Sequence, residues 1–202
     1  IPTELYDKYQ VKRGLRNADG TGVLAGMTTI CNVHGYLVNE GEREPIDGKL
    51  VYRGIDVRDL VEGCEKEDRF GFEEAVYLLL FGKLPSKQQP TRFTELLGHS
   101  RKLPETYTED MIIKAPSPNV MNKMARGVLA LYSYDPEAEL KDIQSEMRKS
   151  IQLIARMPTM MVNAYQVKRR HYDNESMFFH PLNPDEGVAE SILSTLRNDR
   201  QY

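Results

Sequence analysis

The chain has 202 residues, of which 40% are hydrophobic, and its 27 Lys and Arg against 30 Asp and Glu give a formal net charge of −3. This length is enough for one large domain or two small ones with a substantial core. The near-balance of charge gives no electrostatic basis for binding nucleic acid or an anionic membrane surface. The longest apolar run, Ala75 to Phe81, is far below the ~18 residues that a membrane-spanning helix needs, so we expect no membrane association.

Cysteine usage predicts a reducing compartment. Cys31 and Cys64 are too few for a disulfide scaffold, and they lack the CxxC spacing of a zinc site. The first residues, which begin Ile1-Pro2-Thr3-Glu4, contain no basic stretch leading into an apolar one, as a secretory signal would. We therefore expect a cytoplasmic protein with two free thiols.

The only convincing β region runs from Met27 to Arg53. Clusters of turn-forming residues predict turns at 39–41 and 45–48, followed by a strand over 49–53. The pattern indicates a short hairpin or meander, which is too small to stand alone and should pack on helices. Ahead of it, residues 17–22 (NADGTG) predict a turn. They do not predict a phosphate-binding loop, because GxGxxG spacing and a preceding strand are both missing.

From Asp56 onward the apolar residues recur with helical spacing. Asp56 is expected to cap a short helix that Gly63 ends, and Gly82 with Pro85 is expected to end the next one. The predicted helices cover 57–62, 72–81, 86 to about 101, 106–114, 120–132, about 140–171 and 187–197. No strand–helix–strand alternation appears, so the predicted fold class is mostly α with a small β hairpin.

The helix from Val120 to Tyr132, capped by Asn119, allows two interpretations. Its apolar residues recur at helical spacing beside small residues: Met121, Met124, Val128 and Leu131, with Ala125, Gly127 and Ala130. Methionines fill gaps in a core, whereas small residues let a second helix approach closely. Spacing alone leaves a core helix and a helix–helix interface equally open.

The longest predicted helix runs from about Leu140 to about His171. One apolar face recurs along it at Ile143, Met147, Ile151, Ile154, Met161 and Tyr165. Pro158 lies inside this pattern and removes one backbone hydrogen bond, so we expect a kink there. After it, residues 173–175 should end the helix, and 180–184 should form a rigid loop.

Residue types and spacing reveal no catalytic set. The four histidines, His34, His99, His171 and His180, form no i, i+4 pair and have no neighbouring ligands, so no metal site is expected. His171 follows three basic residues at a helix end, which indicates capping more than an anion contact. The carboxylate pairs Glu73-Glu74 and Glu109-Asp110 fall at helix starts, where they interact with the helix dipole. No GxSxG elbow is present. A helical interaction protein would suit these features equally well.

Several stretches nevertheless resemble the citrate synthase family, in the family's order and across nearly the whole chain. The most specific are YRGIDVRDL at 52–60 and EEAVYLLLFGKLP at 73–85. The other stretches lie at 14–17 and 20–22, at 130–135, at 153–159 and in the His180-Pro181 loop. The stretches in this sequence are most similar to those of the bacterial enzymes. The family has a long, kinked helix where Pro158 falls.

The resemblance implies a multi-helical large domain in a homodimer. The helices from Val120 to Tyr132 and from Leu140 to His171 match two of the family's interface helices, which favours the interface interpretation. The implied reaction condenses acetyl-CoA with oxaloacetate to citrate and CoA. Acetyl-CoA is a substrate, and no cofactor is implied. A carboxylate would take a proton from the acetyl methyl while histidines stabilise the enol and act on the oxaloacetate carbonyl.

The family's catalytic histidines, catalytic aspartate and substrate arginines all match positions beyond Tyr202. The resemblance therefore implies that residues 1–202 are an N-terminal portion of the large domain, without the small CoA-binding domain and without catalytic residues. We expect no turnover from this chain alone, and self-association through the exposed helices. A 2-methylcitrate synthase fragment and a non-catalytic helical dimerisation module are the alternatives.

Overall fold

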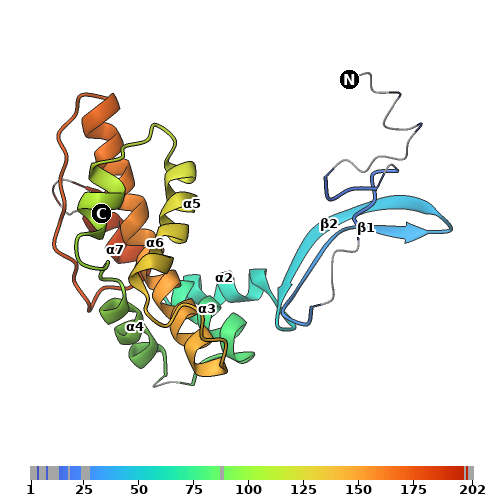
Figure 1. The fold of residues 1–202 in the computed structure, drawn as a ribbon. Helices are drawn as coiled ribbons and strands as arrows, with labels where there is room; N and C mark the ends of the chain where they lie inside the picture. Colours follow the sequence, from blue (N-terminus) through green and yellow to red (C-terminus); the bar gives the residue numbers. More distant parts are fainter. Residues whose placement is uncertain are drawn as a thin grey trace. The chain divides into compact units, whose positions relative to one another are not determined.

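The computed structural model describes residues 4, 8, 14–17, 19–23, 28–86, 89–197 and 199. It divides into two units, Ile1–Val57 and Arg58–Tyr202. Figure 1 shows both, and its element labels are used below. Met27, where the β region was expected to start, and positions 87 and 88 of the third predicted helix lie outside the described residues.

The first unit contains a three-stranded antiparallel sheet in the order β1 (Cys31–Asn39), β2 (Glu42–Tyr52) and β3 (Ile55–Asp56). The turn predicted at 39–41 is confirmed: Glu40 and Gly41 connect β1 to β2 with φ values of 49° and 88°. Positive φ at both turn residues matches the right-handed twist of the paired strands.

The second predicted turn, at 45–48, is wrong. These residues lie inside β2, and the register between the strands shifts opposite the stretch from His34 to Tyr36. A β-bulge takes up the extra residues, and bulges tolerate the Pro and Gly that otherwise weaken a strand. The turn-forming residues at 45–48 therefore belong to an irregular strand and not to a turn.

The expected loop at 17–22 folds back onto the hairpin. The backbone N–H of Asn17 donates to the carbonyl of Thr21, and the N–H of Gly22 donates to the Tyr36 hydroxyl. Arg43 lies over the Tyr36 ring and donates to the carbonyl of Gly20. Ala18, inside this loop, lies outside the described residues.

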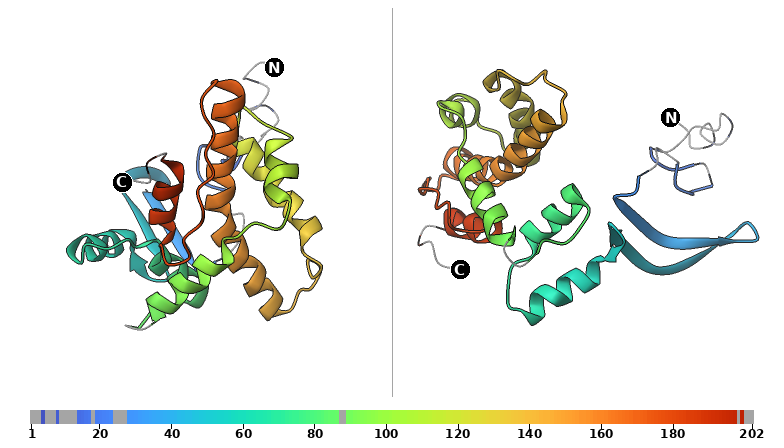
Figure 2. Two further views of the ribbon diagram at one scale, coloured as in Figure 1. Left: turned by 90° about the vertical axis from the view of Figure 1, so that its left-hand side faces the viewer. Right: turned by 90° about the horizontal axis from the view of Figure 1, so that it is seen from below.

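The second unit is helical, which confirms the predicted fold class. Its elements are α2 (Val57–Lys66), α3 (Phe72–Phe81), α4 (Gln89–Ser100), π-helix η1 (Thr108–Ile113), α5 (Val120–Ala130), 3₁₀-helix η2 (Leu131–Tyr134), α6 (Ile143–Tyr172) and α7 (Val188–Leu196). Helix α6 lies at the centre, with α4, α5 and α7 packed against it (Figures 1 and 2).

Two hydrophobic clusters form along α6. The first contains Tyr107, Ile112 and Met124 against Met160, Ala164 and Val167. The second contains Val76, Phe93, Leu97 and Val188 against Ala155. Helix α6 thus supplies the shared wall of both clusters, and its central part is held from several sides.

Two predicted helix boundaries are wrong for local reasons. Helix α2 passes through Gly63 and continues to Lys66, because Gly63 keeps an ordinary helical backbone. Helix α6 begins at Ile143 rather than near Leu140, because the Asp142 carboxylate accepts hydrogen bonds from the backbone of Gln144 and Ser145. Hydrogen bonds from Ser145 also hold the pKa of Asp142 below its usual value.

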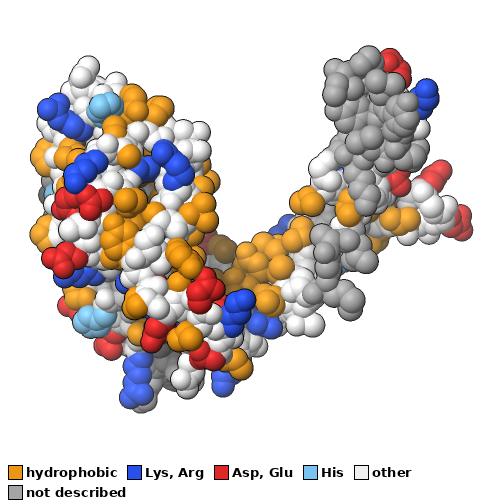
Figure 3. Space-filling model, viewed as in Figure 1, with side chains coloured by type: hydrophobic (Ala, Val, Ile, Leu, Met, Phe, Trp, Pro, Cys, Tyr) orange, Lys and Arg blue, Asp and Glu red, His pale blue; other side chains and the backbone are white. Residues whose placement is uncertain are grey.

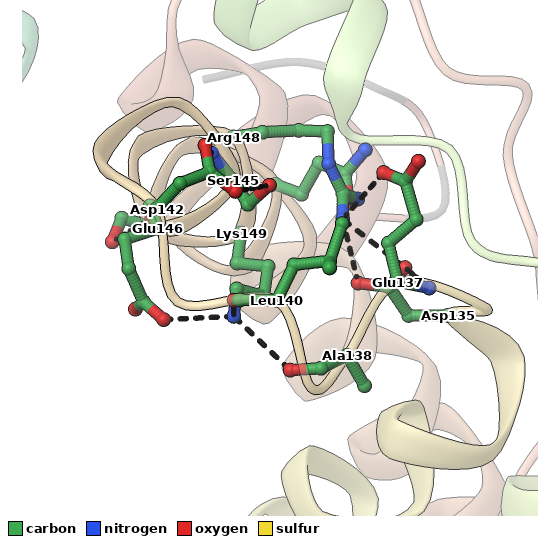
Figure 4. Close-up of polar contacts among 11 residues, drawn as sticks. Asp135, Glu137, Ala138, Leu140, Asp142, Ser145, Glu146, Arg148 and Lys149 are labelled. Atoms are coloured by element: carbon green, nitrogen blue, oxygen red, sulfur yellow. Dashed lines mark hydrogen bonds and ion pairs between the residues drawn. The ribbon is translucent and has the colours of Figure 1, made fainter.

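The segment before α6 is fastened by side chains from the first turns of that helix (Figure 4). Lys149 donates to the carbonyls of Ala138 and Leu140, at 3.1 and 2.6 Å. Arg148 pairs with the carboxylate of Asp135. These contacts replace the extra helical turn that the sequence pattern predicted.

Pro158 lies inside an unbroken α6. Ala155, Met160 and Val162 around it are buried, and this packing offsets the cost of about 3 kcal/mol that an interior proline imposes. The kink itself stays a prediction.

Candidate functional site

The four histidines lie on separate elements. His34 is exposed on β1, His99 is exposed on α4, His171 is exposed at the end of α6, and His180 is half-buried in the loop before α7. Within the described parts of the chain, no three His, Cys, Asp or Glu side chains are grouped so that they could hold a metal ion. Cys31 and Cys64 are free thiols.

The basic residues before His171 are engaged locally. Lys168 pairs with Asp173 at 2.7 Å, and Arg169 pairs with Glu175. Both carboxylates follow the end of α6, so the pairs fasten the chain where it leaves the helix. This arrangement favours the capping interpretation over a contact with an external anion.

The carboxylates that the sequence placed at helix starts have structural partners. Glu74 pairs with Arg69, and Asp110 pairs with Lys114 at 2.6 Å. Glu73 is buried, and its Oε1 accepts a hydrogen bond of 2.6 Å from the backbone N–H of Val188. Glu73 therefore satisfies a backbone N–H in the first turn of α7, 115 residues further along the chain.

A second buried charged residue, Arg101, contacts the segment before α7. Arg101 is 2% exposed and donates to the carbonyls of Asn183 and Glu186, at 3.1 and 2.7 Å. Burial lowers the pKa of Arg101, whereas the nearby carboxylates, Glu186 foremost, raise it. Gly98 packs closely against the backbone of Pro184, since a Cβ at position 98 would lie 1.9 Å from the Pro184 carbonyl oxygen. We call Glu73, Gly98 and Arg101 the α7 cluster.

Lys123 and Tyr107 are also buried polar groups with backbone partners. Lys123 donates to the carbonyl of Ala115 at 2.7 Å and to that of Met111, and burial lowers its pKa. The Tyr107 hydroxyl donates to the carbonyl of Gly127 at 2.7 Å, and burial raises its pKa to about 12. Both side chains join α5 to the segment around η1, which is a structural role.

The exposed apolar side chains of α5 and α6 remain as the candidate surface. On α5, Met124 is buried in the core, but Met121 is 78% exposed. On α6, the predicted apolar face is divided. Ile151 and Ile154 pack against the second hydrophobic cluster, whereas Ile143, Met161 and Tyr165, here called the α6 stripe, are 85%, 37% and 39% exposed. Figure 3 shows hydrophobic side chains on the visible surface of the helical unit. Met124 therefore agrees with the core interpretation of the α5 pattern, and the interface interpretation stays a prediction.

A family model decides what kind of protein this is. The model described as "Citrate synthase, C-terminal domain" matches residues 16–202. The chain belongs to the citrate synthase family.

Curated members of the citrate synthase family are similar over most of this chain. A citrate synthase of Saccharolobus solfataricus is 31% identical over 152 residues, which are 73% of this chain and 36% of that protein. A 2-methylcitrate synthase 1 of Corynebacterium glutamicum is 29% identical over 186 residues, 92% of this chain and 42% of that protein. The chain therefore spans about two fifths of the length of these relatives.

Solved structures agree on the fold. Citrate synthase from Pyrobaculum aerophilum superposes with a TM-score of 0.66 at 22% identity, covering 90% of this chain and 44% of that one. The enzyme from Thermotoga maritima gives 0.62 at 22% identity, covering 92% and 41%. The expected citrate synthase-like helical fold is confirmed.

None of the described helices is long and apolar enough to cross a bilayer. The sequence analysis did not find the α7 cluster, because its residues lie more than 80 positions from the residues they contact near α7, and no local pattern links the two.

Proposed function

We propose that this chain is the scaffold portion of an enzyme that condenses acetyl-CoA with oxaloacetate to citrate and CoA. The family model that matches residues 16–202 carries this proposal. The chain would correspond to an N-terminal portion of the large helical domain, and the small CoA-binding domain and the catalytic segments would lie elsewhere. Acetyl-CoA would be a substrate, with no cofactor required.

The chemistry of the condensation explains why the chain would not act alone. Removing a proton from the acetyl methyl needs a base within hydrogen-bond reach, and the developing enolate needs donors at its oxygen. Across the described residues, the carboxylates best placed by sequence are paired or capping, and the histidines lie on separate elements. The contribution of this chain would be to support helices that position such groups.

The coding frame beyond Tyr202 tests this proposal. We expect it to continue and to encode two histidine motifs and an aspartate motif. A stop codon directly after Tyr202 would contradict the proposal and favour a non-catalytic helical dimerisation module.

A second candidate is 2-methylcitrate synthesis from propionyl-CoA. The similarity to the Corynebacterium 2-methylcitrate synthase 1, which extends over 92% of this chain, supports it. Comparing kcat/KM for acetyl-CoA and propionyl-CoA in the protein encoded by the whole frame separates the two. A higher value for acetyl-CoA supports citrate synthesis, and a higher value for propionyl-CoA supports the alternative.

We also propose that two copies associate through α5 and α6. The support is the α6 stripe, because apolar side chains this exposed on a 30-residue helix suit burial against another helix. Replacing Met161 with Glu should weaken the dimer at least tenfold, since a carboxylate would be desolvated in the interface. Sedimentation velocity over a dilution series measures this.

The matched control for Met161→Glu is Leu96→Glu, at another exposed apolar residue, on α4. It should leave the dimer unchanged. A monomeric wild-type chain, or equal weakening by both variants, would contradict association through this stripe. A cytoplasmic location, with Cys31 and Cys64 reduced, completes the proposal.

A further inference from the structure

The sheet of the first unit is a two-stranded ribbon over most of its length. β1 and β2 pair with each other, whereas β3 pairs with β2 at Val51 and Tyr52 (Figure 1). Among the described residues, no strand lies on the outer side of β1. An isolated two-stranded ribbon is at most marginally stable in water, so this sheet would gain from a further strand.

The two strands of the ribbon differ in how well their sequences prevent further pairing. β2 contains a proline and five charged residues: Pro45, with Glu42, Arg43, Glu44, Asp47 and Lys49. Charges and proline are the usual protection of a sheet edge. β1 contains no Pro, Lys, Arg, Asp or Glu. The irregular register also belongs to β2, which has residues 46–48 where β1 has Gly35 alone. The outer side of β1, here called the β1 edge, is therefore unprotected.

Apolar side chains are exposed along the β1 edge. Val33, Leu37 and Val38 are 73%, 54% and 61% exposed. Cross-strand pairs of apolar side chains stabilise a sheet, whereas like charges in opposite positions destabilise it. Because β1 carries no Lys, Arg, Asp or Glu, two copies of this strand can pair without that repulsion.

The kind of partner follows from the backbone. A helix could cover a face of the ribbon, but an extended strand is what pairs with the N–H and C=O groups along an edge. The described part of the chain contains three strands, and all of them already belong to this sheet. A second copy of the chain supplies a matching strand.

We propose that β1 pairs antiparallel with β1 of a second copy, around a two-fold axis near Gly35, the middle residue of the strand. The two ribbons then form one four-stranded sheet with a β2 strand at each outer edge. Pro45 and the charges of β2 protect those edges, so the association closes at two copies instead of growing into a fibre. This pairing is independent of the association through the α6 stripe.

Crosslinking through a single thiol tests the strand pairing. Gly35→Cys is introduced into the 202-residue chain with Cys31→Ser and Cys64→Ser, and with Met161→Glu to exclude association through the α6 stripe. Apart from its chain neighbours, no atom lies within 4 Å of the Cβ position at Gly35, so the ribbon should accept the new side chain. A short bismaleimide should join the chains into covalent dimers, measured on denaturing gels over a dilution series.

The matched control is Asp47→Cys in the same background, at an exposed position of β2. In the proposed sheet the two copies of this position lie three strand spacings apart, about 14 Å, so crosslinking should be at least tenfold lower. Equal crosslinking of Gly35→Cys and Asp47→Cys would overturn the proposal.

A charge on the β1 edge provides a second test. Val33→Lys, added to the Gly35→Cys chain, places two like charges in the paired edges and should lower the crosslinking at least tenfold. Ile46→Lys, on β2, should leave it unchanged. Circular dichroism checks that both variants fold. Unchanged crosslinking in a folded Val33→Lys chain would contradict the pairing, and particles larger than a dimer in light scattering would contradict its closure at two copies.

Discussion

Replacing Arg101 with Met is expected to lower the free energy of unfolding by about 3–5 kcal/mol, the range for removing one partner of a buried charged network. The methionine fills much of the same volume but donates no hydrogen bond. The carbonyls of Asn183 and Glu186 would lose their donors, and the nearby carboxylates would lose the cation that faces them. Urea denaturation followed by circular dichroism measures the change.

The control for Arg101→Met lies on α4. Arg92 is exposed, and Arg92→Met should change the free energy of unfolding by no more than about 0.5 kcal/mol. Similar losses in both variants would mean that the arginine count matters rather than the buried contacts of Arg101.

Replacing Gly98 with Ala is expected to cost about 3 kcal/mol, although alanine favours a helix by about 1 kcal/mol relative to glycine. The new Cβ would meet the carbonyl of Pro184 at 1.9 Å, and a backbone atom moves aside less readily than a side chain. The loop before α7 would have to shift away from α4. The same urea denaturation measures the loss.

Gly63→Ala is the matched substitution within α2. Apart from its chain neighbours and the helix's own backbone, no atom lies within 4 Å of the Cβ position there, and the residue is helical. Alanine should therefore raise the free energy of unfolding by about 0.5–1 kcal/mol. If both glycine variants were destabilised equally, the close approach of Pro184 would not explain the Gly98 result.

Elements with a local signal were predicted well. Helix α3 ends at Gly82, which adopts a φ of 76°, a backbone conformation that glycine adopts without strain. Helix α5 begins after Asn119, whose side chain accepts a hydrogen bond from the backbone of Asn122. In both cases one residue and its immediate neighbours decide the boundary.

Elements decided by distant contacts were predicted poorly. Residues 45–48 form part of an irregular strand because β1 pairs with Pro45 and Lys49 on either side of the register shift, although their composition predicted a turn. The buried side of α6 depends on which helices surround it, and the apolar stripe predicted as its face includes the exposed residues Ile143, Met161 and Tyr165. The partner of Glu73 lies on α7, beyond the reach of any sequence pattern.

The distinction between local signals and distant contacts applies to function as well. The family was predicted from several ordered stretches, of which those at 52–60 and 73–85 are the most specific, and the match over residues 16–202 confirms it. A pocket lined by residues of 102–109, 159–163 and 178–182 and by Thr195 was not predicted, because these four segments show no shared spacing.

Thiol release measures whether this chain is a scaffold without catalytic residues of its own. The purified 202-residue chain is incubated with oxaloacetate and either acetyl-CoA or propionyl-CoA, and free CoA is followed with a thiol reagent. We expect release no faster than in the protein-free blank with either substrate. Clear release that grows with protein concentration would contradict it, because the catalytic groups would then lie within these residues.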